Sequence, residues 1–176
     1  ILTEYLIDKA VSIYKLRYKY IERVNEYSGK IYQDIMGLDG FNISYVTEFD
    51  IGHKTNDELK KELKDLFKKK YDYDVKLSST TVGPHKDDIE FLLHNNNLKF
   101  FGSQGQQRIA VLSFKLSEIN IFKKYKETTP ILLLDDIFSE LDDTKKNNLL
   151  KYISKDIQTI ITTTELTNLD SRLIKK

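Results

Sequence analysis

Two short apolar runs, separated by one segment of helical character, limit the folds that this chain can adopt. The first run is ILLL at 131–134, and Pro130 stops the element before it. The second run is QTIIT at 158–162, and the segment between them, at about 143–153, has the pattern of a helix. Continuous apolar runs of this length are typical of strands buried on both faces of a parallel sheet. A strand, a helix and a second strand in this order predict an α/β fold.

Carboxylates directly follow the first of these strands. Asp135 and Asp136 end the run LLLDD, and Asp142 stands six residues past Asp136 in the turn SELD at 139–142. The C-terminal ends of parallel strands lie at the rim of the sheet, where open α/β folds bind ligands. Mg²⁺ prefers one or two carboxylates together with waters and phosphate oxygens. The acids therefore fit a magnesium site, and they equally fit a strand end with solvated side chains.

Polar residues also stand at a predicted helix start and at the end of the second predicted strand. In FFGSQGQQR, residues 100–108, Ser103 and Gly105 come where a helix begins, and the free N–H groups of a first helical turn can bind an anion. The alternative is that Gly102-Ser103 is an ordinary N-cap and Gly105 flexible backbone. The second run ends in IITTTE, 160–165, which places hydroxyl groups at the same rim, although Thr is also common in strands.

The first 37 residues contain no Pro and only one Gly before Gly37, and their spacing predicts one long helix. This helix is either half of an antiparallel helical arm with heptad spacing or an amphipathic helix on an ordinary core. The residues with four-three spacing, in which only Arg17 breaks the apolar pattern, are Leu6, Ala10, Ile13, Arg17, Tyr20, Val24, Tyr27 and Ile31.

The middle of the chain predicts mixed structure. Residues 41–50 are rich in β-formers, and a capping box from Thr55 to Glu58 begins a helix with an apolar stripe. Residues 88–101 predict a hairpin that turns at Asn95-Asn96-Asn97, and 104–126 a helix. The stripe consists of Leu59, Leu63, Leu66 and Phe67. The apolar face of the later helix consists of Ile109, Leu112, Leu116 and Ile119.

Charged groups in this part of the chain have two interpretations. The lysines of the first helix could meet phosphates or form a solvated face with the acids between them; they are Lys60, Lys61, Lys64, Lys68, Lys69 and Lys70. GPHKDD, residues 83–88, suggests a metal site through His85, Asp87 and Asp88, but no second histidine has ligand spacing. We therefore favour a structural or DNA-facing use of GPHKDD.

Composition excludes several classes. The 176 residues have a net charge of +1 and no cysteine, so disulfides, Cys-ligated zinc and a strong overall basic field are absent. The 40% hydrophobic content supports a packed core. No apolar run approaches membrane-spanning length. Because the chain does not begin with Met, we expect it to be a fragment or a processed piece.

The order of these segments resembles the C-terminal half of an ABC-type ATPase head. SQGQ at 103–106 resembles the signature motif, Leu132–Asp136 a Walker B strand and SELD at 139–142 a D-loop, and Thr162–Thr164 fall where such ATPases have a switch residue. More narrowly, GSQGQQR, LLLDDIFSELD and GPHKDD together resemble the RecF family of SMC-like ABC ATPases. The resemblance rests on motifs from about Thr80 to the end of the chain, and on position in the chain for the helical arm.

The resemblance implies an architecture and a function. It implies a partial ABC-type head, the signature and Walker B lobe, at 76–176 and a helical arm, part of the second domain of RecF proteins, at 1–75. It implies a bacterial, cytoplasmic, DNA-binding ATPase that uses ATP and Mg²⁺ and dimerises with ATP between its heads. The implied partners are DNA with a single-strand/double-strand junction at gaps, RecO and RecR, with which such proteins load RecA.

The resemblance also implies roles for residues of the signature segment. Ser103 and Gly105 would contact the γ-phosphate bound on the opposing subunit. Gln104 replaces the usual second-position glycine, and Gln106 and Arg108 would support the start of the helix.

The remaining implied roles lie at the two strand ends. Asp135 would hold magnesium through water, and Asp136 would stand where most ABC ATPases have a catalytic glutamate. Ser139 and Asp142 would belong to the D-loop at the dimer interface. Thr164 would occupy the switch position usually held by histidine, with Thr163 as the alternative; a threonine can hydrogen-bond but cannot carry positive charge.

One ATPase motif is missing from the sequence. No G-x-x-x-x-G-K-[ST] occurs, so a P-loop that cradles nucleotide phosphates is absent. We therefore expect a C-terminal portion of a split head that, by itself, neither binds ATP tightly nor hydrolyses it. The alternatives are another SMC-like or ABC head and a non-enzymatic DNA or protein adaptor that retains the fold.

Overall fold

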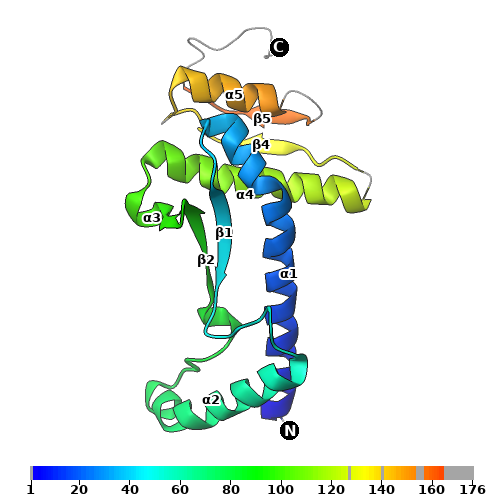
Figure 1. Ribbon diagram of the computed structural model, residues 1–176, viewed down its shortest axis with the longest axis vertical. Coiled ribbons are helices and arrows are strands. Elements are labelled where there is room, and N and C mark those ends of the chain that lie inside the picture. Colours follow the sequence, from blue (N-terminus) through cyan, green and yellow to red (C-terminus); the bar gives the residue numbers. More distant parts are fainter. Residues whose placement is uncertain (1, 127, 140, 154–156, 165–176) are drawn as a thin grey trace. The chain divides into compact units, whose positions relative to one another are not determined.

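The computed structural model describes residues 2–126, 128–139, 141–153 and 157–164 (Figure 1). These residues form two compact units. Unit 1 holds the described residues of Ile1–Glu22 and Ser44–Glu90, and unit 2 those of Arg23–Ile43 and Phe91–Lys176. In chain order the elements are α1 (Leu2–Met36), β1 (Phe41–Val46), α2 (Asn56–Leu77), the 3₁₀ helix η1 (Pro84–Lys86), β2 (Asp88–Leu93), β3 (Asn96–Asn97), α3 (Leu98–Phe101), α4 (Gln104–Lys126), β4 (Leu132–Leu134), α5 (Asp143–Ile153) and β5 (Thr159–Ile161).

The predicted long helix is confirmed as α1, but its buried stripe differs from the heptad set. Leu6 and Ile13 are 49% and 40% exposed, whereas Ile7, Val11 and Tyr14 are buried. A straight α-helix repeats every 3.6 residues, so its buried face drifts away from a strict heptad. Within the described residues this pattern fits an amphipathic helix on an ordinary core, although Ala10, Val24 and Ile31 of the heptad set are also buried. The helical arm stays a prediction.

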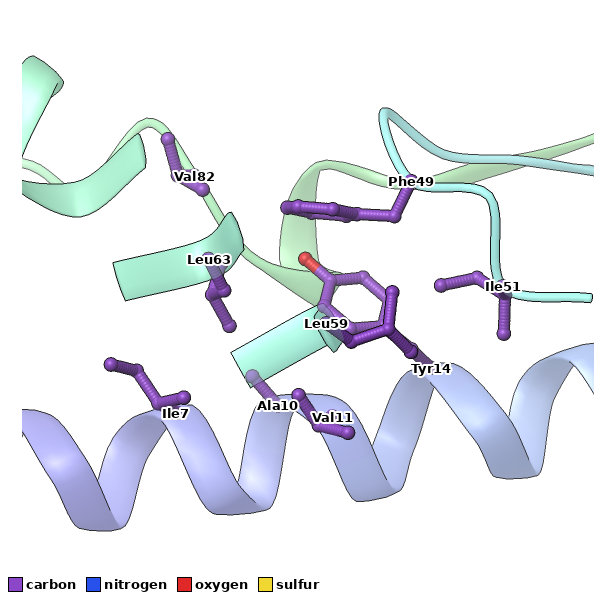
Figure 2. Close-up of a cluster of buried hydrophobic side chains, with 9 residues drawn as sticks. All are labelled: Ile7, Ala10, Val11, Tyr14, Phe49, Ile51, Leu59, Leu63 and Val82. Carbon is purple, nitrogen blue, oxygen red and sulfur yellow. The ribbon is translucent and has the colours of Figure 1, made fainter. Parts of the chain in front are cut away.

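The core of unit 1 lies between α1 and α2. Figure 2 shows Ile7, Ala10, Val11 and Tyr14 along α1, facing Leu59 and Leu63 of α2. Phe49, Ile51 and Val82 from the connecting segments complete the cluster. The predicted apolar stripe of α2 is therefore confirmed, with Leu66 and Phe67 partly buried against the same cluster.

The predicted capping box of α2 is also confirmed. The Glu58 amide donates to Thr55 Oγ1 over 3.3 Å, and the Thr55 amide donates to Glu58 Oε2 over 2.7 Å. Several lysines of this helix pair with acids, as a solvated face would: Lys60 with Asp8, Lys64 with Glu4 and Lys68 with Asp65.

The GPHKDD segment is anchored by one buried carboxylate. The Asp87 side chain is only 6% exposed, accepts a hydrogen bond from the Tyr45 hydroxyl and lies 3.7 Å from Arg17 Nη1. Arg17 also donates to the Pro84 carbonyl. Burial, together with the Asp87 hydrogen bond, raises the pKa of Tyr45. Arg17, which breaks the heptad pattern, thus holds this segment.

In unit 2, α1 approaches β1 closely through small and polar residues. The Asn25 amide donates to the Ile43 carbonyl over 2.7 Å and accepts from the Ile43 amide over 2.9 Å. A Cβ on Gly29 would lie 3.1 Å from the Phe41 carbonyl oxygen. Tyr32 stacks on Phe41 at 4.3 Å between ring centroids. Strand β1 is the first in the sheet order β1-β2-β3. The Asn25 side chain therefore hydrogen-bonds the Ile43 backbone at the outer edge of this strand.

The predicted hairpin is only partly correct. Strand β2 is confirmed, but the turn is at His94 and Asn95, which have φ of 48° and 65°, and Leu93 pairs with Asn96. Residues 98–101 form the short helix α3, not the predicted strand. The reason is that the Asn97 side chain accepts from the Lys99 amide over 2.9 Å and caps that helix.

The predicted strand–helix–strand unit is confirmed as β4, α5 and β5, with β4 and β5 parallel and Leu133 paired with Ile160. Helix α4 is also confirmed, and its predicted apolar face is buried. The expectation that the strands are buried on both faces is wrong within the described residues. Leu132 and Leu134 are buried, but Leu133 is 70% and Ile160 56% exposed, because side chains of a strand alternate between two faces and only one is covered.

The two units do not coincide with the predicted ranges 1–75 and 76–176. Helix α1 contributes to both units, and 76–90 belong to unit 1. The assignment of an arm and a head to those ranges stays a prediction. In the part of the chain that the structure describes, no helix is long and apolar enough to cross a bilayer.

Candidate functional site

The ends of β4 and β5 bring carboxylates and a hydroxyl together. The Thr162 amide continues the strand pairing by donating to the Leu134 carbonyl over 2.9 Å. The Thr162 hydroxyl donates to an Asp135 carboxylate oxygen, and its oxygen accepts from the Asp136 amide over 3.1 Å. Both acids are exposed. The predicted meeting of the two strand ends at one rim is therefore confirmed, with Thr162 as the bridging residue.

Asp136 has an unusual backbone conformation. Its φ of 45° lies in the left-handed region, which costs free energy for residues with a Cβ and is tolerated best by Asn and Asp. Hydrogen bonds on both sides of the residue hold this conformation: Thr162 binds its amide, and its carbonyl accepts from Arg108. Such backbone strain is common where a side chain must be aimed at a ligand.

Arg108 connects helix α4 to the loop after β4. Its Nη1 donates to the Asp136 carbonyl over 3.0 Å and to Ser139 Oγ over 2.9 Å. The Ser139 hydroxyl donates to the same Asp136 carbonyl over 3.3 Å. The resemblance assigned Arg108 to the start of its own helix, whereas these contacts join α4 to the segment between β4 and α5.

Ser103 caps α4. The Gln106 amide donates to Ser103 Oγ over 3.3 Å, and Gln106 Oε1 accepts from the Ser103 amide over 2.8 Å. This is a reciprocal capping box, so the N-cap interpretation of Ser103 holds and Gln106 supports the helix start. Gln104 and Gly105 lie in the first turn, with Gln104 exposed and Gly105 half-buried.

The turn before Ser103 depends on Gly102 and on Gln107, to which the sequence interpretation gave no role. Gln107 Nε2 donates to the Leu98 carbonyl over 2.9 Å and to the Gly102 carbonyl over 3.1 Å. A Cβ on Gly102 would lie 2.7 Å from the Leu98 carbonyl oxygen, too close for any other residue without a shift. These contacts fix where Ser103 is presented.

Asp142 is the N-cap of α5. Its Oδ1 accepts from the Lys145 amide over 2.9 Å, and Lys145 Nζ contacts its other oxygen. These hydrogen bonds to Lys145 lower the pKa of Asp142. The predicted D-loop residue is thus an exposed acid at a helix start, while Glu140 of the same turn lies outside the described residues.

The assignment of the switch position to Thr164, with Thr163 as the alternative, stays a prediction. Thr162, not Thr164, contacts the acids, and the sequence signal for Thr162 was its place directly after the second apolar strand. Thr164 is exposed and Thr163 half-buried.

The GPHKDD segment holds its histidine against the backbone. His85 Nε2 lies 2.8 Å from the Thr80 carbonyl oxygen, and the described residues contain no group of three or more acids and histidines that could hold a metal.

Comparison with known proteins identifies the family. The chain is 37% identical over 176 residues to the DNA replication and repair protein RecF of Shouchella clausii, covering 99% of this chain and 47% of that protein. It is 42% identical over 165 residues to RecF of Clostridium botulinum (strain Loch Maree / Type A3), covering 93% and 44%. The chain belongs to the RecF family. It spans about half the length of the curated RecF relatives that it matches.

Solved RecF structures share the fold. The structure of the recombination mediator protein RecF-ATPrS in the RecFOR pathway matches with a TM-score of 0.77 and 31% identity, over 95% of this chain and 45% of that one. The RecF-ATP structure matches with a TM-score of 0.70 and 32% identity, over 93% and 44%. The predicted fold, part of an ABC-type ATPase head, is therefore confirmed. No protein-family model matches the chain.

Proposed function

We propose that this chain supplies the signature helix, the Walker B strand and the D-loop of a RecF-type DNA-repair ATPase, and that a segment outside the 176 residues supplies the P-loop. The open apolar face around Leu133 and Ile160 supports this division, because parallel sheets are normally covered on both faces. A P-loop lobe packed on that face would complete the head.

One observation carries the proposal. A continuous hydrogen-bonded network joins three motifs that lie far apart in the sequence: Arg108 from the signature helix, Asp136 and Ser139 after β4, and Thr162 after β5. A scaffold without chemistry would have no need to gather acids, a hydroxyl and a guanidinium at one sheet rim. The family membership gives this network its interpretation as an ATPase site.

The carboxylate of Asp135 fits the proposed magnesium site. Mg²⁺ is commonly bound by one or two carboxylates with the remaining positions filled by water and phosphate oxygens. The Asp135 side chain is exposed, and Thr162 holds one of its oxygens, so the carboxylate is oriented yet accessible. When bound, the ion would neutralise charge on the phosphates of ATP.

Ser103 is the proposed contact to the nucleotide of the opposing subunit. Its oxygen accepts from the Gln106 amide, but a serine hydroxyl can also donate one hydrogen bond. An anion at this position would also meet the free N–H groups of the first turn, including that of Gly105. The capping geometry is therefore compatible with phosphate recognition, in an ATP-sandwiched dimer whose interface also includes Ser139 and Asp142.

Asp136 is the proposed catalytic carboxylate, which would orient or deprotonate the attacking water. Its carboxyl group is one methylene shorter than that of glutamate, so we propose slow turnover. Thr164 remains the proposed switch residue, with Thr163 as the alternative. Thr162 then has a different role, which is to hold Asp135 and the Asp136 amide in place.

We further propose the biological setting that the family suggests. The RecF structures with nucleotide are described as belonging to the RecFOR pathway. This description supports action together with RecO and RecR. We propose that this action takes place at single-strand gaps in DNA, where RecA is loaded, in the bacterial cytoplasm.

The experiment that tests the proposal uses the protein in which this chain is joined to its P-loop segment. Light scattering is expected to show monomers without ATP and dimers with ATP, and Ser103→Arg should abolish the ATP-dependent dimers because its long cation would occupy the phosphate position. Ser103→Thr, which keeps a hydroxyl and a cap, is the control. Dimers that form without ATP, or that persist in Ser103→Arg, would instead support the non-enzymatic adaptor.

A further inference from the structure

We infer that Arg108 couples the two nucleotide sites of the dimer, by joining the helix that contacts the partner's nucleotide to the loop that carries this protomer's own Asp136. This inference rests on the proposed function. In a sandwich dimer, each protomer serves two sites: its signature works at the partner's nucleotide, and its acids work at its own. Arg108 is the residue whose contacts reach from one set to the other.

The signature side of this connection is rigid. Ser103 is fixed to the first turn of α4 by the reciprocal bonds with Gln106, and Arg108 follows five residues later on the same helix. The next residues, Ile109 and Ala110, are fully buried. Because a packed helix moves as a unit, a displacement at Ser103 is carried to Arg108.

The catalytic side is held at few points. The Asp136 amide is bound by Thr162 at 3.1 Å, and its carbonyl by Arg108 at 3.0 Å and by Ser139 at 3.3 Å. Arg108 also holds the Ser139 hydroxyl at 2.9 Å, so it controls both donors on that carbonyl. With a φ of 45°, Asp136 is in a conformation that relaxes when these bonds are lost.

These contacts provide a mechanism by which nucleotide at one site affects the other site. When the partner's ATP binds at Ser103, α4 is held against the dimer interface, and Arg108 sets the Asp136 carbonyl. The orientation of the Asp136 peptide determines where its carboxylate points. Nucleotide at one site therefore favours the hydrolytic arrangement at the other, which makes Arg108 a positioning residue and not a catalytic one.

The geometry predicts how substitutions of Arg108 behave. Nη1 has two hydrogens, and each goes to a different acceptor. Glutamine has an amide of similar shape on a shorter stem, which falls short of the loop, whereas lysine retains charge and most of the length but loses the planar fork. We expect Arg108→Gln to uncouple the sites and Arg108→Lys to restore the coupling in part.

Hydrogen–deuterium exchange of the P-loop-joined protein, with and without ATP, reads the coupling directly. In the wild type, ATP is expected to slow amide exchange both in 103–107 and in 135–139. In Arg108→Gln, ATP should still protect 103–107 but no longer 135–139. Turnover should fall about tenfold with KM changed less than about twofold, and any Hill coefficient above one should fall to about one. Lys115→Gln removes a charge from the exposed part of the same helix and is the matched control.

The outcomes separate this inference from the function it rests on. If ATP protects 103–107 in the wild type and in Arg108→Gln, and protects 135–139 equally in the two proteins, the coupling role of Arg108 is overturned while the proposed function stands. If ATP protects neither segment in the wild type, the nucleotide does not reach Ser103 and both fail. Unchanged thermal midpoints for Arg108→Gln and Arg108→Lys will show that the variants are folded.

Discussion

Asp136→Asn is expected to lower ATP turnover of the P-loop-joined protein by at least about 100-fold while leaving ATP-driven dimers intact. The amide keeps the size of the side chain, and Asn tolerates the left-handed backbone that Asp136 adopts. The hydrogen bonds to its main chain, from Thr162 and Arg108, do not involve the carboxylate. The substitution therefore removes only the group that orients or deprotonates water. Phosphate release under steady-state conditions measures the loss.

Asp143→Asn is the matched control for this prediction. It makes the same change of charge at an exposed acid in the first turn of α5, whose carboxylate lies 3.7 Å from Lys146 Nζ. Its turnover should stay within about twofold of the wild type, because substitutions of exposed groups outside a site usually have small effects. Equal turnover in Asp136→Asn and the wild type would remove Asp136 from the chemistry and point to an acid outside this chain.

Asp87→Ala is expected to lower the free energy of unfolding by about 2 kcal/mol, as loss of a hydrogen bond to a buried charged group does. The Asp87 side chain is 6% exposed, and its loss leaves the Tyr45 hydroxyl and the Arg17 guanidinium without their carboxylate. The effect stays below that of a fully buried pair because Arg17 is 46% exposed. Urea unfolding of the 176-residue chain, followed by circular dichroism, measures it.

Asp88→Ala serves as the comparison, since Asp88 is exposed and its carboxylate binds only the neighbouring Ile89 amide among the hydrogen bonds described. Its loss should change stability by less than about 0.5 kcal/mol. This difference would establish that GPHKDD uses its first Asp to anchor the segment. Comparable losses for the two substitutions would mean that the buried Asp87 contacts contribute nothing particular, and the DNA-facing interpretation of the whole segment would gain support.

The parts of the fold that could be predicted are those determined by local pattern. Helix α4, the parallel pair β4 and β5, and helix α5 follow from apolar spacing and from a Pro at a boundary. The capping box at Thr55 could be predicted because both of its partners lie within three residues. Segments such as 98–101 could not, because four apolar and basic residues fit a strand or a helix equally and the Asn97 cap decided between them.

The residue types of the candidate site could be predicted from the sequence, but the contacts between those residues could not. That acids and hydroxyls meet at one rim follows from parallel strands ending together. Which threonine of Thr162–Thr164 faces the acids depends on the register of β5 against β4, which no local pattern specifies. The contacts of Arg108 join residues 28 and 31 positions apart in the sequence, so they appear only once the chain is folded.

The most direct test of the central claim, that Ser103 acts on the nucleotide of the opposing subunit, is ATP turnover in mixtures of two inactive proteins. One protein carries Ser103→Arg with an intact P-loop, and the other an intact Ser103 with its P-loop lysine replaced. A mixed dimer then holds one complete site. Each protein alone should be inactive, because neither forms ATP-dependent dimers with itself. An equal mixture should recover up to about half of wild-type turnover, since each mixed dimer holds one of two sites. A mixture as inactive as its components would contradict the claim.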